Sequence, residues 1–119
     1  MIKDILVNLS TEKKRDVATD YAISIARELD AHLTGVAFAY EPIVPGTVFN
    51  GVSASIVAAY RNDSKKAAKT AAENFEQLGR GAAISNESRV IGASFDAAAD
   101  IFGRFARRYD LSIVRQTDP

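Results

Sequence analysis

Few residues of this sequence combine the types and spacing that chemistry requires. His32 is the only histidine, and cysteine is absent, so disulfides, thiolate metal sites and a cysteine nucleophile are excluded. No second ligand stands at metal-binding spacing from His32, and we expect an exposed residue there between the first helix and the second strand. No G-x-S-x-G segment, which would indicate a catalytic serine, occurs. The sequence therefore predicts a protein that is not an enzyme and holds no metal.

Gly79 and Gly81 flank Arg80 in a glycine-rich segment of the kind that can cradle a phosphate. The segment follows a predicted helix and precedes a predicted strand, which is the reverse of the order that a nucleotide-binding loop needs. It therefore predicts the end of a helix. The basic residues Lys65 and Lys66, like those near Arg104, alternate with acids and indicate exposed helix faces.

Charge and hydropathy narrow the class of partner. Lys and Arg total 15 and Asp and Glu total 15, so the formal net charge is zero. Nucleic-acid binding is not expected, because such domains carry a basic surplus or a basic stripe. The absence of net charge leaves little electrostatic self-repulsion and favours self-association.

No stretch approaches the roughly 20 apolar residues that span a bilayer. The N-terminal segment "MIKDILVNL" carries Lys3 and Asp4 and lacks the apolar core of a signal peptide. We expect a cytoplasmic protein without a membrane partner.

The elements that must position these residues alternate between strand and helix. Apolar runs at 2–9 and 33–40 predict strands covered on both faces, and 82–91 predicts a more exposed strand. A short run at 111–114 predicts a fourth strand. Helices are predicted at 17–30, 53–78 and 95–109. The order βαβαβαβ favours an α/β fold: a three-layer α/β/α sandwich with a mostly parallel sheet, in one domain over residues 1–119.

The predicted helices have candidate caps and buried faces. Ser10 and Thr11 are candidate N-caps of the first helix. Its apolar stripe would comprise Val17, Tyr21, Ile25 and Leu29, with Ala22 and Ala26 beside them. Before the last helix, Gly92 is predicted to turn the chain and Ser94 to cap. Phe95 and Phe102 are predicted to face the sheet.

The position of a ligand follows from the fold. In open parallel sheets, ligands lie outside the carboxyl ends of the strands where the strand order reverses. That rule selects Asn8, Leu9 and Ser10 after the first strand, and 115–117 after the fourth. The apolar segment 41–51 is expected to pack over these strand ends as a cover.

Three segments in order resemble the universal stress protein domain: "IKDILVNLS", "DYAISIARELDAHLTGVAFAY" and "VIGASFDAAADIFGRFARRYDLSIV". The resemblance covers the chain from Ile2 to Val114. It implies the adenine nucleotide alpha-hydrolase-like fold. It also implies a small cytoplasmic protein of the stress response, usually a homodimer. Many members of the family bind ATP.

The family's nucleotide site would fall on Asn8, Ser10, Phe38 and Arg115 by position, and this sequence departs from it. Ser10 stands where the nucleotide-binding members have an aspartate, and Arg115 where their first phosphate-loop glycine stands. The sequence ends at Pro119, before the other glycines and before the family's last helix and strand. The resemblance thus implies a degenerate site with no cofactor, and a protein that acts by association with itself or with partners.

Two alternatives remain open. In the first, the chain is an ATP-binding stress sensor whose site is completed by residues absent from this sequence. In the second, it is a small-molecule binder that uses the crevice at the reversal of strand order. A two-component receiver domain is excluded, because Asn8, Leu9 and Ser10 replace the acidic pair that follows its first strand.

Overall fold

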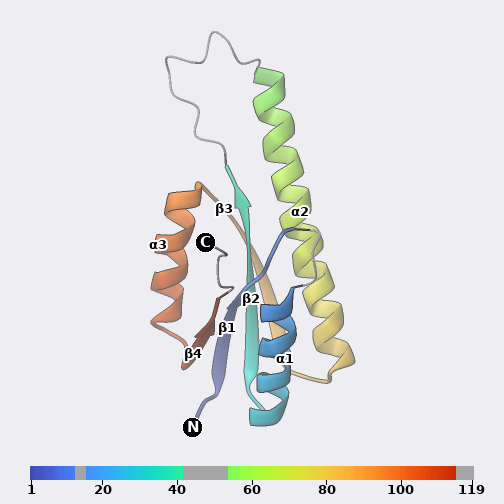
Figure 1. Cartoon of the computed structure of the whole chain (residues 1–119), viewed down its shortest axis with the longest axis vertical. Helices are drawn as coiled ribbons and strands as arrows, with labels where there is room; N and C mark the ends of the chain where they lie inside the picture. Colours follow the sequence, from blue (N-terminus) through green and yellow to red (C-terminus); the bar gives the residue numbers. More distant parts are fainter. Residues whose placement is uncertain (13–15, 42–53, 115–119) are drawn as a thin grey trace.

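Strands and helices alternate in the computed structural model, which describes residues 1–12, 16–41 and 54–114 (Figure 1). Within those residues the elements are β1 (Asp4–Asn8), α1 (Val17–Leu29), β2 (His32–Tyr40), α2 (Ala54–Gly81), β3 (Asn86–Ala93), α3 (Phe95–Ala106) and β4 (Leu111–Ile113). This is the predicted order, with most boundaries moved by one to four residues.

The strands form one parallel sheet in the order β3-β2-β1-β4. The register places Ile5 of β1 opposite Leu33 of β2 on one side and Leu111 of β4 on the other. The order reverses direction between β1 and β4, so the carboxyl end of β1 lies at the switch point of the sheet.

Helices cover both faces of the sheet, as predicted (Figure 1). Ile5 and Val7 of β1 pack with Ala22 of α1 and Phe75 of α2 in one core cluster. Leu6 points to the other face and packs with residues of α3. The continuous apolar runs of β1 and β2 are required by burial on both faces. The α/β/α sandwich is confirmed.

The first helix is capped by a residue that the sequence did not single out. Asp16 is the N-cap of α1, and its side chain accepts a hydrogen bond from the Thr19 amide. Ser10 and Thr11 do not cap the helix, so that prediction was wrong. A carboxylate at this position also interacts favourably with the positive end of the helix dipole.

The predicted apolar stripe of α1 was wrong for its large residues and right for its alanines. Val17, Tyr21 and Leu29 are exposed, whereas Ala22 and Ala26 are fully buried. Residues four apart drift by about 40° per step around a helix, so four such residues do not share one face. Small alanines instead bring α1 close to the sheet.

The third crossover differs from the prediction in two places. Gly92 lies inside β3, opposite Ala39, rather than in a turn. Ser94 caps α3 as predicted and Phe102 is buried, but Phe95 is 74% exposed. Its ring instead lies 5.6 Å from that of Tyr40, centroid to centroid.

The glycine-rich segment ends a helix, as predicted. α2 ends at Gly81, and the left-handed conformation that follows is adopted by Ala83, with φ 56°. Gly79 lies within α2, where a Cβ would stand 2.5 Å from Asn86 Nδ2, so any larger residue would displace the Asn86 side chain.

In the part of the chain that the structure describes, no helix is long and apolar enough to cross a membrane. The predicted cover at 41–51 lies outside the described residues, apart from Glu41.

Candidate functional site

The carboxyl end of β1 continues into a short hydrogen-bonded segment. The Leu9 amide donates to the Val36 carbonyl over 2.8 Å, which extends the contact of β1 with β2 by one residue. The Ser10 amide then donates to Asp16 Oδ2 over 2.9 Å, and Ser10 Oγ accepts from the Glu12 amide over 3.2 Å. The switch point is therefore fixed by bonds within the chain itself.

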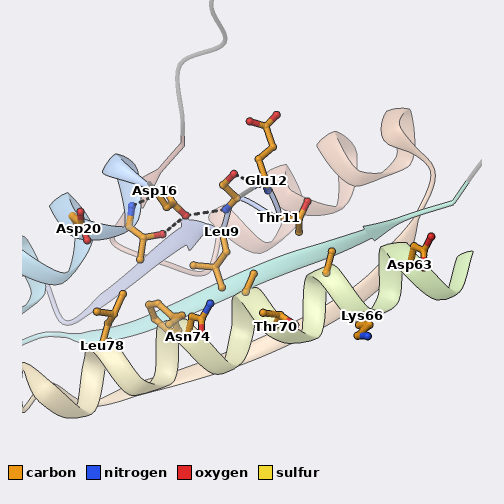
Figure 2. Close-up of a pocket in the computed structure, with 15 residues that line it drawn as sticks. Leu9, Thr11, Glu12, Asp16, Asp20, Asp63, Lys66, Thr70, Asn74 and Leu78 are labelled. Atoms are coloured by element: carbon orange, nitrogen blue, oxygen red, sulfur yellow. Dashed lines mark hydrogen bonds between the residues drawn. The ribbon is translucent and has the colours of Figure 1, made fainter. Parts of the chain in front are cut away.

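Asp16 is the centre of this segment (Figure 2). Its Oδ1 accepts from the Thr19 amide over 3.1 Å, while its Oδ2 accepts from Thr19 Oγ1 over 2.6 Å as well as from the Ser10 amide. One carboxylate thus ties the end of β1 to the first turn of α1. The Ser10 amide, next to the switch point, thus already has an anionic acceptor.

Beside this segment lies a groove of about 1070 Å³ between α1 and α2. Leu9 and Phe75 form part of its apolar floor, and Thr70 and Asn74 of α2 contribute polar groups. Figure 2 shows the labelled α2 side chains following one another along the helix, across from Glu12, Asp16 and Asp20. A groove of this volume is large enough for a small-molecule ligand.

Among the residues that the structure describes, the charged groups of the groove are mostly acidic. This described lining includes the carboxylates of Glu12, Asp16, Asp20 and Asp63 and the ammonium group of Lys66, whereas Lys13, Lys14 and Arg15 lie outside the described residues. Like charges in a partly enclosed site repel, so this lining disfavours a triphosphate and favours a cation.

The structure brings together two of the four residues at family site positions. Asn8 ends β1 opposite Val36, and Ser10 lines the groove. Phe38 is 1% exposed and packs in the core cluster on the α3 face of the sheet. Arg115 lies outside the described residues.

Sequence reasoning missed the α2 side of the groove. Lys66, Thr70 and Asn74 follow one another at intervals of four along α2. This spacing puts polar side chains close together on one helix surface. It was the signal in the sequence that could have identified these groove residues. It could not show that the surface faces α1, because that requires the tertiary arrangement.

At the opposite end of the sheet, His32 joins β2 to the segment that enters β3. Ser85 Oγ lies 2.6 Å from His32 Nδ1, and His32 Nε2 lies 3.0 Å from Glu87 Oε1. His32 is thus the half-buried first residue of β2, and the prediction of an exposed connecting residue was wrong.

The order Ser–His–Glu is that of a hydrolytic triad, but a triad also needs donors for an oxyanion and a substrate cleft. Neither of the two described cavities includes any of these three residues. The hydrogen bond from His32 holds the pKa of the Glu87 carboxyl below its ordinary value. This cluster is a connection between strands. The described residues also contain no group of three or more His, Cys, Asp or Glu side chains that could hold a metal.

Comparison with known proteins gives matches of structure. No family model matches the sequence, and no curated protein matches it in sequence. A protein from the universal stress protein family of Burkholderia pseudomallei matches with a TM-score of 0.71 at 21% identity, over 97% of this chain and 82% of that one. The universal stress protein UspA of Lactobacillus plantarum matches with a TM-score of 0.64 at 15% identity, over 99% and 79% of the two chains.

A third structure, a universal stress protein from Archaeoglobus fulgidus, matches with a TM-score of 0.61 at 17% identity, over 100% of this chain and 81% of that one. At these identities the matches show the fold. The predicted resemblance is confirmed at that level: the chain has the fold of the universal stress proteins.

Proposed function

We propose that this chain is a universal stress protein that acts in the stress response by association with itself or with protein partners, without enzymatic activity and without a nucleotide. The observation that carries this proposal is the fold shared with three universal stress protein structures, combined with an acidic groove at the switch point. The same proposal places the protein in the cytoplasm.

The residues at the switch point support a degenerate nucleotide site. Ser10 offers a hydroxyl where the resemblance calls for a charged acceptor, and charge-assisted hydrogen bonds are about twice as strong as neutral ones. The Ser10 amide is engaged by Asp16. Burial of the Phe38 ring leaves that residue within the core rather than beside a base.

Calorimetric titration of the full chain with ATP and Mg²⁺ tests the absence of nucleotide binding. We expect no saturable heat at micromolar concentrations. Ser10→Asp is the matched variant, and it should also fail to bind, because it adds a carboxylate beside the four that line the groove. Saturable micromolar binding by the unaltered chain would instead support an ATP sensor.

A second candidate function is small-molecule binding, which the volume of the groove favours. Its acidic lining selects an amine or another organic cation over an anion. Thermal-shift measurements with a linear polyamine and with ATP would separate the candidates. Stabilisation by the amine that is lost in Asp63→Asn, with no effect of ATP, would support this second function.

A further inference from the structure

We propose that two copies of the chain pair through the outer edge of β3, antiparallel, with Ser88 facing the Ser88 of the second copy across a two-fold axis. This inference rests on the proposed association and specifies its surface. Its basis is a long outer strand whose charges complement themselves in one register.

β3 is an outer strand of the sheet in the part of the chain that the structure describes. It has eight residues and pairs with β2 in a continuous register from Asn86 to Ala93. Outer strands are commonly protected by charged side chains, above all lysine, or by proline, bulges or shortness. β3 contains neither lysine nor proline, and its two charged residues, Glu87 and Arg89, have opposite signs. At the other edge of the sheet, β4 has only three residues.

The direction of the backbone groups in β3 follows from its bonds to β2. The carbonyls of Ser85 and Ala93 accept from the amides of Leu33 and Glu41. Because backbone groups alternate along a strand, the odd-numbered residues of β3 direct their amides and carbonyls to β2. The even-numbered residues, including Ser88, direct theirs outward, where a second strand can bind them.

The charges select one register for such a pair. With Ser88 opposite Ser88, each Glu87 lies opposite the Arg89 of the other copy. These two positions form non-hydrogen-bonded pairs, in which opposing side chains are closest. The neighbouring antiparallel registers would place Glu87 opposite Glu87, or Arg89 opposite Arg89. Like charges directly opposite destabilise a sheet, so these registers are disfavoured.

Both charged side chains are already held on the α3 face of the sheet. Glu87 Oε1 contacts His32 Nε2 at 3.0 Å and Thr34 Oγ1 at 3.4 Å, which leaves Oε2 to accept from the second copy. The Arg89 guanidinium carbon lies 5.8 Å from the centre of the Phe105 ring. Side chains that are positioned before binding lose less conformational entropy in the complex.

The opposite face of the strand adds apolar burial. Val90 is 45% exposed, and in the proposed register it lies opposite Asn86 of the second copy. A net charge of zero adds no general repulsion between copies. The geometry therefore points to an isologous dimer with one continuous sheet across both chains.

Variants of the full chain in which the charges of Glu87 and Arg89 are reversed test the register. Sedimentation equilibrium measures the molecular mass, and hence the dimer, of each variant. Glu87→Arg alone and Arg89→Glu alone each create two like-charge pairs per dimer. Each should raise the dimer dissociation constant about tenfold or more. The double variant Glu87→Arg/Arg89→Glu should dimerise again, because the pairs are restored in reverse. It should not form mixed dimers with the unaltered chain, because every mixed pair then joins like charges.

Three further variants keep the test independent of folding. His32→Ala removes a contact that positions Glu87 within the chain without changing the charges of β3, so the dimer should persist and be weakened less than in either single charge variant. Ser88→Pro removes an amide that points outward, away from β2, and also the hydrogen bond that Ser88 Oγ donates to Glu76 Oε1 of α2. Ser88→Ala loses only that hydrogen bond and is its control. Both chains should stay folded by circular dichroism, while the dimer is lost in Ser88→Pro and kept in Ser88→Ala. A dimer that survives Ser88→Pro and both single charge variants would overturn the β3 interface and leave the proposed function intact. If the unaltered chain is monomeric at millimolar concentration, both this interface and the self-association in the proposed function are overturned. The absence of nucleotide binding is a separate claim, which the ATP titration tests.

Discussion

The Phe75 ring of α2 lies directly against the backbone of Gly35 in β2. A Cβ placed on Gly35 would be 2.9 Å from both Cδ2 and Cε2 of that ring, and 3.0 Å from Leu9 Cδ1. Phe75 is 1% exposed, so the ring has no solvent into which it could move. The glycine thus sets how closely α2 approaches the sheet and how deep the groove floor lies.

Replacing Gly35 by alanine should destabilise the protein. The added methyl group overpacks a buried contact, which costs about 1–3 kcal/mol in the free energy of unfolding. Urea denaturation followed by circular dichroism measures it. The control is Gly103→Ala in α3, where nothing lies within 4 Å of the added Cβ. That variant should gain about 0.5–1 kcal/mol, since alanine favours a helix over glycine. Equal effects of the two variants would contradict the proposed close contact.

Replacing Asp16 by alanine should weaken the start of α1 and the end of β1 together. The loss of a helix N-cap costs about 0.5–2 kcal/mol, and Asp16 also holds the Ser10 amide and Thr19 Oγ1. Asp16→Asn keeps one acceptor oxygen and should cost less than alanine. The two variants are compared by their midpoints in urea. The same midpoint for both would show that the capping oxygen contributes nothing.

Glu87 should make stability depend on pH in the acid range. The hydrogen bond from His32 lowers the pKa of Glu87 from its ordinary value of 4.5, and the charge of Arg89 and a hydrogen bond from Thr34 act in the same direction, while burial opposes them. Because this pKa is lower in the folded state, the contribution to stability is present above about pH 4.5 and is lost as the pH falls through the folded-state pKa.

The matched variant is Glu87→Gln, which has nearly the same shape without the charge. Near neutral pH it should be less stable than the unaltered chain by up to about 1 kcal/mol, because a neutral amide accepts the hydrogen bond from His32 more weakly than a carboxylate does. The difference should shrink as the pH falls below the ordinary pKa of the carboxyl group. A difference that stays constant between about pH 6 and pH 3 would refute this account.

Asp110 should titrate below its ordinary pKa of 3.8 although its carboxyl group is exposed. Its Oδ2 accepts from the Lys3 amide over 2.8 Å and from the Asp4 amide over 3.0 Å, and these bonds stabilise the charged form. The Asp110 amide in turn donates to the Asp4 carbonyl. A titration of the carboxyl carbon by NMR measures the pKa directly. An ordinary value would mean that the start of β1 is not held by this side chain in solution.

The strands that consist of continuous apolar runs were predicted well from the sequence. The helix face that is built from small residues was predicted less well. β1 and β2 were identified because strands covered on both faces need apolar residues throughout. The buried face of α1 was predicted only in part: Ala22 and Ala26 are buried, but the larger Val17 and Tyr21, which carried the hydrophobic signal, are exposed.

Part of the candidate site was predictable and part was not. The rule of the switch point located Asn8 and Ser10 without any coordinates. The role of Asp16 as cap and anchor is local, and its place directly before Val17, the first residue of α1, was an available signal. The contribution of Lys66 from α2 depends on the packing of α1 against α2. Periodicity along one helix gives no information on which neighbour that helix will meet.

The length of α2 also affects the motion of its first turns. Its 28 residues span about 42 Å, whereas the nine residues of β2 span about 30 Å, so the first turns of α2 extend past the sheet (Figure 1). Ile56 and Tyr60 are 64% and 52% exposed there. Amide protons in those turns should exchange with solvent through local fraying, well before global unfolding. This end of the helix can therefore lengthen or shorten with temperature while the core stays closed.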